Sequence, residues 1–454
     1  MNVQSDLTTC SRTSSAYLSA REALRILPAA AYSARYMCYV IGLLSVVNVF
    51  NFMDRVALSV LLPHIKTDLE LSDAQLGLLI GFAFALFYAI CGIPIARWAD
   101  RGTRRNIIAV ALTAWSVMTA LCGAAQNFWQ LFAARVGVGA GEAGCLPAAQ
   151  SIVCDYVRPE RRAVAYAVHS FGLVAGMMLG MALAGWLGEL IGWRWTFVVL
   201  GLPGIAVAVV VRLTLREPVR GFFDVMEPGA AALPFRVTVR QLWHCRTYRL
   251  IVIFLMMNGF VVYGLTQWWP SLYGRVFGLN LSSVGVYLGF AIGAGQGAGL
   301  LLGGLLANKA VRHDARLPLQ VGAVAIALSL PIVVVSLFVP SAQASILLVL
   351  LAGLLWSISN GPVVAALYGS VAPAMRATAG ALSIFLTSVL GLGLGPLFVG
   401  LLSDLLAPSL GVEALRYALL APTALLPAMV FALFKVAKTV PTRLRPADVR
   451  DRGE

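Results

Sequence analysis

Apolar segments of about 20 residues recur along the whole chain, and this length limits what the chain can fold into. Twelve such segments are centred near residues 50, 85, 115, 141, 175, 203, 261, 294, 327, 356, 390 and 425. A helix of about 20 residues crosses the roughly 30 Å hydrocarbon core of a bilayer, whereas a membrane-spanning β-strand has about 9–11 residues of alternating polarity. The pattern predicts an all-α membrane protein with twelve transmembrane helices.

A long polar interruption at 212–248 divides these helices into two sets of six. Pro218, Pro228 and Pro234 within it disfavour regular structure. Residues 1–34 contain no apolar core with a cleavage site, so we expect no cleaved signal peptide. The predicted organisation is a cytoplasmic tail at 1–34, a six-helix bundle at 35–211, a cytoplasmic loop at 212–248, a second bundle at 249–436 and a cytoplasmic tail at 437–454.

The basic residues indicate how the helices are oriented. A formal net charge of +14 can reflect a nucleic-acid partner, but here the basic residues gather on one side of the predicted membrane. Most of the 34 lysine and arginine residues lie on the side of the two tails and the central loop, and the opposite side holds only Lys66, Arg194, Arg275 and Arg416. Since positively charged loops stay in the cytoplasm, we expect a bacterial inner-membrane protein with both termini inside. The expected partners are the lipid bilayer, protons and a small amphipathic or anionic substrate, with no nucleic acid.

Metal, disulfide and enzyme chemistry are not expected. The seven cysteines form no C-x-x-C pair and no cluster with histidine. The chain also lacks the H-E-x-x-H and G-x-S-x-G motifs of membrane hydrolases. We therefore expect no cofactor and no catalytic activity.

Four ionic side chains lie inside segments that otherwise resemble transmembrane helices: Asp54 and Arg55 in the first, Arg135 and Glu142 in the fourth. A charge at bilayer depth costs about 2.5–3.5 kcal/mol even on insertion scales, so such groups usually serve transport or proton transfer. The step from Arg135 to Glu142 turns a helix through about 700°, which leaves both on nearly the same face, about 10 Å apart. We expect a proton-coupling site here, with Asp54 as the main proton site.

The chemistry of these groups suggests how they work. Burial favours the neutral form of a carboxylate, whereas a nearby guanidinium favours the charged form. Asp54 beside Arg135 can therefore alternate between an ion pair and a protonated acid, with Glu142 as a second titrating group. Arginine stays charged and its fork suits a phosphate or carboxylate, so Arg135 or Arg55 can hold an anionic head. A static salt bridge that only joins two helices stays open as the alternative.

The second half offers amides and aromatic rings instead of charges. We expect these side chains to form an amphipathic wall for substrate, although an interfacial aromatic belt is the alternative for any single tryptophan. For His169, plain packing is the alternative to a proton path. The candidate substrate-binding residues of both halves are Asn51, Tyr88, Arg135, Glu142, His169, Tyr263, Gln267, Trp269, Tyr273, Trp356 and Asn360.

Two motifs connect the chain to a known family. The sequence ARWADRGTRR at 96–105 resembles the G-x-L-x-D-R-x-G-R-R motif of the major facilitator superfamily, and departs from it at Ala96, Trp98 and Thr103. The pattern R-x-x-x-G-x-G-E at 135–142 is similar to that superfamily's second motif. The resemblance implies two six-helix halves with substrate bound between them at the midplane.

Further motifs narrow the resemblance. The N-x-x-D-R of 51–55, GEA of 141–143, GWR of 192–194, REP of 216–218 and WWPS of 268–271 resemble the spinster-type lipid transporters over nearly all of 36–436. This family implies proton-coupled movement of lysolipids or sphingosine phosphate. We expect transport by alternating access and a monomeric protein. Neighbouring symporters share several motifs, so small organic anions or drugs are the alternative substrates. A transport-dead sensor or scaffold is the alternative of a different class.

The loop motif also predicts a gate. Asp100, Arg101, Arg104 and Arg105 lie at the cytoplasmic end of the second helix. The Asp100 carboxylate can accept charge-assisted hydrogen bonds at the positive amino end of the eleventh helix, near Thr378. Because this contact requires a closed cytoplasmic side, we expect it to stabilise the outward-facing state.

Overall fold

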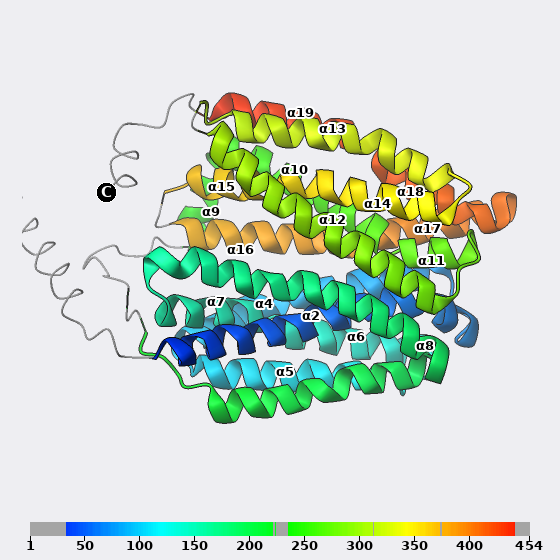
Figure 1. Ribbon diagram of the computed structural model, residues 1–454, viewed down its shortest axis with the longest axis horizontal. Coiled ribbons are helices and arrows are strands. Elements are labelled where there is room, and N and C mark those ends of the chain that lie inside the picture. Colours follow the sequence, from blue (N-terminus) through cyan, green and yellow to red (C-terminus); the bar gives the residue numbers. More distant parts are fainter. Residues whose placement is uncertain (1–32, 221–222, 224–234, 312, 373–374, 441–454) are drawn as a thin grey trace, which may run out of the picture.

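The computed structural model describes residues 33–220, 223, 235–311, 313–372 and 375–440. Every regular element within them is a helix, and nine stretches of helix are long and apolar enough to cross a membrane. Two of these nine cross twice, because the chain reverses at Gly192 and again near Gly411 (Figure 1). One further crossing is made by two shorter helices, α6 and α7. The described chain thus crosses the membrane twelve times, which confirms the predicted fold.

The helix bounds follow the chain in order. The first half contains α2 (Ala34–Asp68), α3 (Asp73–Gly77), η1 (Leu78–Phe82), α4 (Ala83–Arg101), α5 (Arg104–Cys122), α6 (Phe128–Glu142), α7 (Cys145–Tyr156), η2 (Pro159–Arg161) and α8 (Arg162–Thr214). The second half contains α9 (Phe235–His244), α10 (Arg246–Thr266), α11 (Trp269–Arg275), α12 (Leu281–Ala310), α13 (Leu317–Phe338), α14 (Ala342–Ile358), α15 (Asn360–Gly369), α16 (Arg376–Leu386), η4 (Thr387–Gly393), α17 (Leu394–Leu410), η5 (Gly411–Glu413), α18 (Ala414–Thr423) and α19 (Leu426–Thr439).

Local sequence explains where several of these helices begin and turn. Ser72 and Gln75 form a reciprocal capping box that starts α3. Gly192 has φ +78° and Gly411 has φ +55°, a region that side-chain-bearing residues rarely adopt. These two glycines set the tight reversals inside the long helical stretches.

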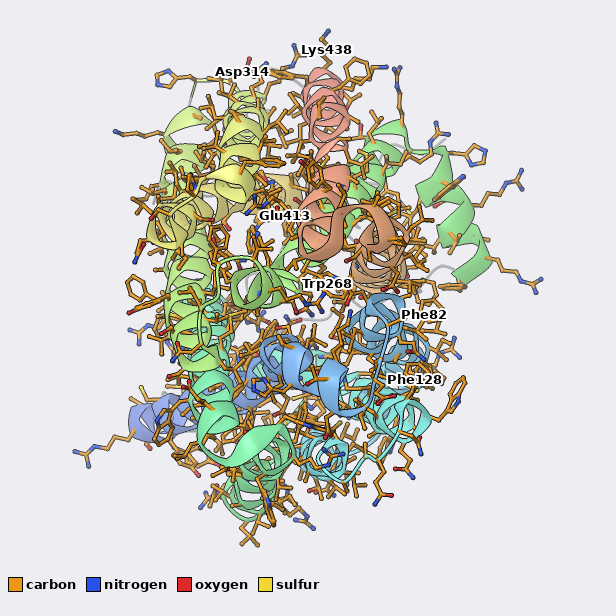
Figure 2. The ribbon with its side chains drawn as sticks, turned by 90° about the vertical axis from the view of Figure 1, so that its right-hand side faces the viewer. Phe82, Phe128, Trp268, Asp314, Glu413 and Lys438 are labelled. Carbon is orange, nitrogen blue, oxygen red and sulfur yellow. The ribbon has the colours of Figure 1, made fainter. Side chains whose placement is uncertain are left out.

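The two halves stack as separate bundles. Figure 1 shows the blue-to-green helices of the first half below the green-to-red helices of the second. Figure 2, which views the molecule along its long axis, shows the same division, with Phe82 and Trp268 near the boundary. We call the end that contains Gly192 and Gly411 the closed end, and the opposite end, where α2 begins and α19 ends, the open end.

The seam between α8 and α12 shows why these names apply. A β-carbon at Gly185 would lie 2.5 Å from the Leu281 carbonyl oxygen, so only glycine permits this approach. Farther toward the open end, a β-carbon at Gly297 would lie 3.6 Å from Val174, and one at Gly304 would meet nothing within 4 Å. The two helices therefore touch at the closed end and diverge toward the open end.

The seam between the second and eleventh crossings repeats this pattern. A β-carbon at Gly77 would lie 2.6 Å from the Pro396 carbonyl oxygen, and one at Gly81 would lie 2.6 Å from that of Gly393. At Gly92, farther along α4, a β-carbon would have no neighbour within 4 Å. At both seams, the two bundles are in contact at the closed end and separate toward the open end.

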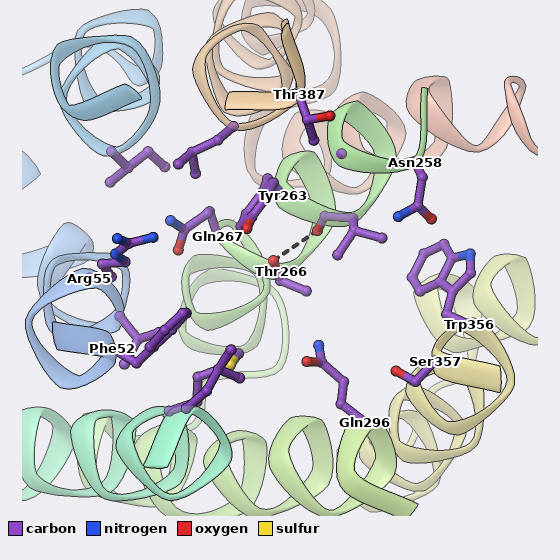
Figure 3. Close-up of a pocket in the computed structure, with 18 of the residues that line it drawn as sticks. Phe52, Arg55, Asn258, Tyr263, Thr266, Gln267, Gln296, Trp356, Ser357 and Thr387 are labelled. Atoms are coloured by element: carbon purple, nitrogen blue, oxygen red, sulfur yellow. Dashed lines mark hydrogen bonds between the residues drawn. The ribbon is translucent and has the colours of Figure 1, made fainter. Parts of the chain in front are cut away.

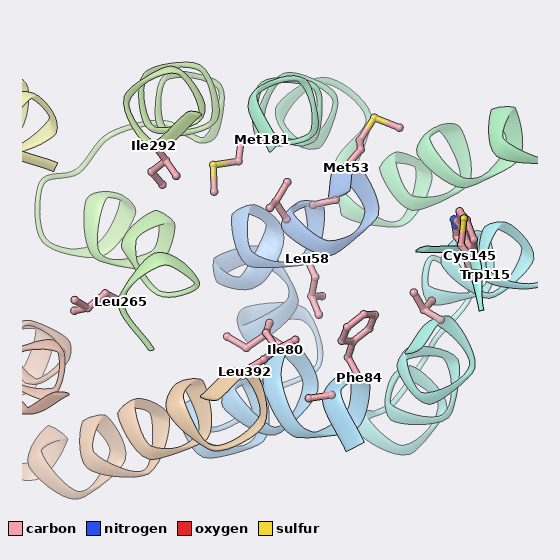
Figure 4. Packing of buried hydrophobic residues seen from close by; sticks show 14 of the residues in the cluster. Met53, Leu58, Ile80, Phe84, Trp115, Cys145, Met181, Leu265, Ile292 and Leu392 are labelled. Atoms are coloured by element: carbon pink, nitrogen blue, oxygen red, sulfur yellow. The ribbon is translucent and has the colours of Figure 1, made fainter. Parts of the chain in front are cut away.

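The joined part of this second seam contains two π-helical segments. η1 and η4 contact each other across the boundary between the halves. Figure 4 shows Ile80 of η1 and Leu392 of η4 packed together, and Met181 opposite Ile292 in the α8–α12 seam. Such single π-turns are frequent at functional sites.

Polar contacts also join the halves at the closed end. The Asp404 carboxylate accepts hydrogen bonds from the backbone N–H groups of Asp73 and Ala74, at 2.9 and 2.7 Å. The Asp73 carboxylate in turn accepts from the Arg275 guanidinium at 2.8 Å and from the Ser403 hydroxyl at 2.7 Å. Asp404 thus caps the amino end of α3 from the other bundle.

Candidate functional site

A central cavity of about 270 Å³ lies between the two halves. Figure 3 shows Arg55 and Phe52 on one side, and Trp356 and Ser357 across the cavity from them. Of the predicted site residues, the lining includes Arg55, Arg135, Tyr263, Gln267, Trp356 and Asn360. The structure therefore brings charges from the first half and aromatic and amide groups from the second half to one space.

The buried ion pair of the site joins Arg55 to Glu142. The Arg55 Nε atom lies 2.7 Å from Glu142 Oε2, and the Glu142 side chain has no exposed area. The other carboxylate oxygen, Oε1, has no hydrogen bond of normal geometry among the described residues. Asp54 and Arg135, for which we expected an ion pair, form no salt bridge in this structure, so that expectation is corrected.

Three aromatic rings surround the Arg55 guanidinium. Its central carbon lies 4.9 Å from the ring centre of Phe52, 4.8 Å from that of Phe84 and 4.9 Å from that of Tyr88. Aromatic faces attract a cation, and the attraction is stronger away from water. These rings compensate the burial of Arg55 and fix its guanidinium between Glu142 and the central cavity.

Asp54 occupies a separate, fully buried position behind the cavity. Its Oδ2 atom accepts a hydrogen bond of 3.2 Å from the Thr119 hydroxyl of α5, and Oδ1 has no hydrogen bond of normal geometry among the described residues. Asp54 interacts electrostatically with both Glu142 and Arg135. Burial, the Thr119 hydrogen bond and the charged neighbours are the features that make Asp54 a candidate proton site.

Arg135 lines the central cavity and forms few hydrogen bonds there. Its guanidinium carbon lies 5.4 Å from the ring centre of Phe84. The Nε and Nη1 atoms are buried and have no hydrogen-bond partner among the described residues. Unsatisfied buried donors are costly, and an anion in the cavity would satisfy those of Arg135.

A smaller cavity of about 50 Å³ lies on the other side of Arg55. It brings together the predicted residues Asn51, Tyr88, Glu142 and His169. Neither ring nitrogen of His169 has a hydrogen bond of normal geometry. Arg55 lines both cavities, so it connects the buried acid with the larger space.

The polar residues that the structure adds to the second-half wall include Thr266, Gln296, Ser357 and Thr387. Gln296 lies on α12 among closely packed glycines, and an isolated amide at bilayer depth is a signal that could have identified it. Thr387 begins η4, and nothing in its local sequence distinguishes it from a packing threonine.

Trp269 and Tyr273 do not line either cavity, which corrects their expected place in the substrate wall. The helix is interrupted at Gln267 and Trp268, and α11 beyond this break packs at the closed end. The Tyr273 hydroxyl forms a hydrogen bond of 2.6 Å with Ser345. Both side chains are almost completely buried and stabilise the closed end.

The gate residues are only partly described. The side chains of Asp100 and Arg101 lie outside the described residues, so their gating role stays a prediction. Arg104 pairs with Asp155 and, at 2.8 Å, with Glu217. The Arg105 backbone N–H donates to the same Glu217 carboxylate at 2.9 Å. Asp155 belongs to α7 and Glu217 follows the end of α8, so in this structure Arg104 and Arg105 fasten the chain after α8 to the first bundle.

Comparison with known proteins agrees with this architecture. Residues 44–396 match the family model of the Major Facilitator Superfamily. The chain belongs to the major facilitator superfamily. It is 36% identical over 385 residues to an MFS-type efflux pump of Mycolicibacterium smegmatis, covering 84% of this chain and 87% of that protein. Members of this superfamily are transporters rather than enzymes, and this chain is therefore a multi-pass membrane transporter.

Spinster proteins are also among its relatives. Protein spinster of Drosophila melanogaster is 29% identical over 238 residues, which cover 52% of this chain and 39% of that protein. A crystal structure of a bacterial homologue of the human lysosomal transporter Spinster, inward-facing and unoccupied, matches with a TM-score of 0.80, 31% identity and coverage of 90% and 98%. The cis,cis-muconate transport protein of Acinetobacter baylyi is 26% identical over 360 residues, covering 77% of this chain and 84% of that protein.

Proposed function

We propose that this protein is a proton-coupled secondary transporter that moves an amphiphile with an anionic or zwitterionic head, of the lysolipid or sphingosine-phosphate type. The observation that carries the proposal is the position of Arg55. Its guanidinium pairs with the buried Glu142 and also lines the central cavity. One cation therefore stands between a proton-binding acid and the space for a substrate.

Competition for Arg55 can couple protons to transport. When Glu142 is charged, its charge-assisted hydrogen bond holds the guanidinium. When Glu142 binds a proton, that bond weakens, and the permanently charged guanidinium becomes available to a phosphate or carboxylate head. Asp54 modulates this exchange through its electrostatic interaction with Glu142.

The opposite wall suits the remaining part of an amphiphile. Tyr263 and Trp356 provide aromatic surface, and Gln267 and Gln296 provide amide groups for a polar linker. The helices that line this wall diverge toward the open end, which gives a long chain a path out of the cavity. We propose that the open end faces the cytoplasm, as the basic residues predict, and that the transporter works as a monomer in the bacterial inner membrane.

A small organic anion or drug is the second candidate substrate. A volume of about 270 Å³ is near the lower limit of the roughly 300–1,000 Å³ of small-molecule sites. The named relatives include an efflux pump and a muconate transport protein. The muconate transport protein supports a small organic anion as the substrate. In this case Arg55 and Arg135 would bind the carboxylates directly.

Flux into proteoliposomes distinguishes these possibilities. Purified protein is reconstituted, and uptake of a lysophospholipid, a sphingosine phosphate and a small dicarboxylate is followed with and without a pH gradient. We expect gradient-dependent movement of an amphiphile. Movement of the dicarboxylate alone would support the second candidate, and the absence of flux for every compound would contradict transport of either class.

A further inference from the structure

The short helix α9 lies at the open end, between the central loop and α10. Thr238 and Leu242 are buried, and α9 packs against α10 and α16. In Figure 2, which looks along the long axis, α9 is the green helix at the right edge and is seen from its side. It therefore runs across the bundle axis at the rim of the molecule, in the plane of the membrane surface.

Exposed guanidinium groups lie on α9 and on the first turn of α10. Arg236 and Arg240 on α9, and Arg246 and Arg249 at the start of α10, are exposed. Residues 235–249 contain no aspartate or glutamate. Within the described parts of the chain, none of these four arginines forms an ion pair. The surface is thus a local concentration of positive charge with no counter-charge among the described residues.

Aromatic side chains accompany the charges. Phe235 is 60% exposed and Trp243 is 53% exposed. Arg236, Arg240 and Trp243 follow the i, i+4, i+7 spacing that places residues on one face of a helix. A stripe of basic and aromatic residues on a helix in the membrane plane is typical of helices that lie in the lipid head-group region.

We infer that α9 binds the head groups of anionic phospholipids. Topology alone requires only positive charge in this loop, whereas the structure also orders the charges on a helix, turns them outward and adds an aromatic residue to the stripe. Through Cys245, α9 continues directly into α10, which carries Asn258, Tyr263 and Thr266 of the central cavity. Bound lipid therefore holds the open end of a helix that lines the transport site. This inference does not depend on the substrate or on proton coupling.

Spin-labelled lipids test the inference on the full-length protein in proteoliposomes. Electron paramagnetic resonance gives the protein's relative affinity for labelled phosphatidylglycerol over labelled phosphatidylcholine of the same chain length. An arginine near an anionic membrane surface is worth about fivefold in affinity. We expect the wild type to prefer phosphatidylglycerol several-fold, and the double variant R236Q/R240Q to lose most of that preference. High salt should weaken the wild-type preference, because the attraction is electrostatic.

Two matched variants complete the experiment. R97Q/R158Q removes the same charge from exposed arginines at the same end of the first half, and should keep the preference. R236K/R240K keeps the charge on α9 and should also retain it. The inference is overturned if R236Q/R240Q prefers phosphatidylglycerol as strongly as the wild type, or if R97Q/R158Q loses the preference to the same extent, because the effect would then reflect net charge rather than α9.

Discussion

Asp54 and Arg55 are neighbours in the chain but work in different surroundings, because successive residues of an α-helix point about 100° apart. Asp54 faces α5, where Thr119 donates to it. Arg55 faces α4 and α6, where aromatic rings and Glu142 surround its guanidinium. One turn of α2 thus supplies both a buried acid and the cation that reaches the cavity.

Replacing Asp54 by asparagine should separate transport from proton coupling. The amide can keep a hydrogen bond to Thr119, so the variant should fold, but it cannot exchange a proton. We expect uptake driven by a pH gradient to be lost, while exchange of substrate across the membrane without a gradient continues. Gradient-driven uptake at the wild-type rate in this variant would show that Asp54 is not a coupling site.

Glu142→Gln should change how substrate affinity depends on pH. In the wild type, a rising pH charges Glu142, which then competes for Arg55, so affinity for an anionic head should fall as pH rises. In the variant this competition is absent at every pH, and affinity should stay near its low-pH value. Calorimetric titration of purified protein with substrate, repeated from acidic to alkaline pH, measures how affinity changes with pH in the wild type and in the variant.

The matched control for this variant is Asp68→Asn. Asp68 pairs with Arg194 at the closed end, inside the first half, and its loss should leave the pH slope unchanged. Equal slopes for the wild type and Glu142→Gln would reduce the Arg55–Glu142 pair to a structural link between helices.

At the scale of elements, the closed end depends on close contact between the second and eleventh crossings. The β-carbon positions of Gly77 and Gly81 face the backbone of α17 and η4. The Asp404 carboxylate adds charge-assisted hydrogen bonds to the amino end of α3. These contacts must separate before the cavity can open at this end, so they stabilise the conformation seen here.

Asp404→Asn should therefore favour opening of the closed end. Hydrogen bonds to a charged group contribute about 1.5–3 kcal/mol, and a loss of about 1–3 kcal/mol shifts a balanced equilibrium roughly 5- to 150-fold. Spin labels on the closed ends of α3 and α17 should report longer distances in the variant. The Asp68→Asn control should leave the distances unchanged. If the distances are also unchanged in Asp404→Asn, the Asp404 cap does not stabilise the closed end.

For the whole molecule, the length and spacing of apolar segments were enough to predict twelve helices in two halves. Residue depth also follows from sequence, and for this reason Arg55, Arg135, Tyr263 and Trp356 could be assigned to the midplane cavity. Which helix faces which neighbour does not follow, because it depends on packing between distant segments. The sequence therefore suggested Arg135 rather than Arg55 as the partner of a buried acid.

The errors in the second half have the same physical origin. Trp269 follows an interruption in its helix that turns α11 into the closed end, and depth counted from sequence does not reveal such a turn. Gln296 is an isolated amide on a glycine-rich helix, but its approach to the cavity depends on how α12 packs against α14. Local sequence patterns identified the kinds of side chain in the site, whereas packing between distant helices determines which of them line the cavity.

The central claim is that one guanidinium, that of Arg55, exchanges between a protonatable acid and an anionic substrate head. Uptake of a labelled lysophospholipid into proteoliposomes, with and without an imposed pH gradient, tests it most directly when the wild type is compared with Arg55→Lys and Glu142→Gln. We predict uptake that follows the gradient in the wild type, strongly reduced uptake in Arg55→Lys because a lysine cannot bridge the acid and the head as a fork, and uptake insensitive to the gradient in Glu142→Gln. Gradient-driven uptake of equal size in all three proteins would contradict the claim.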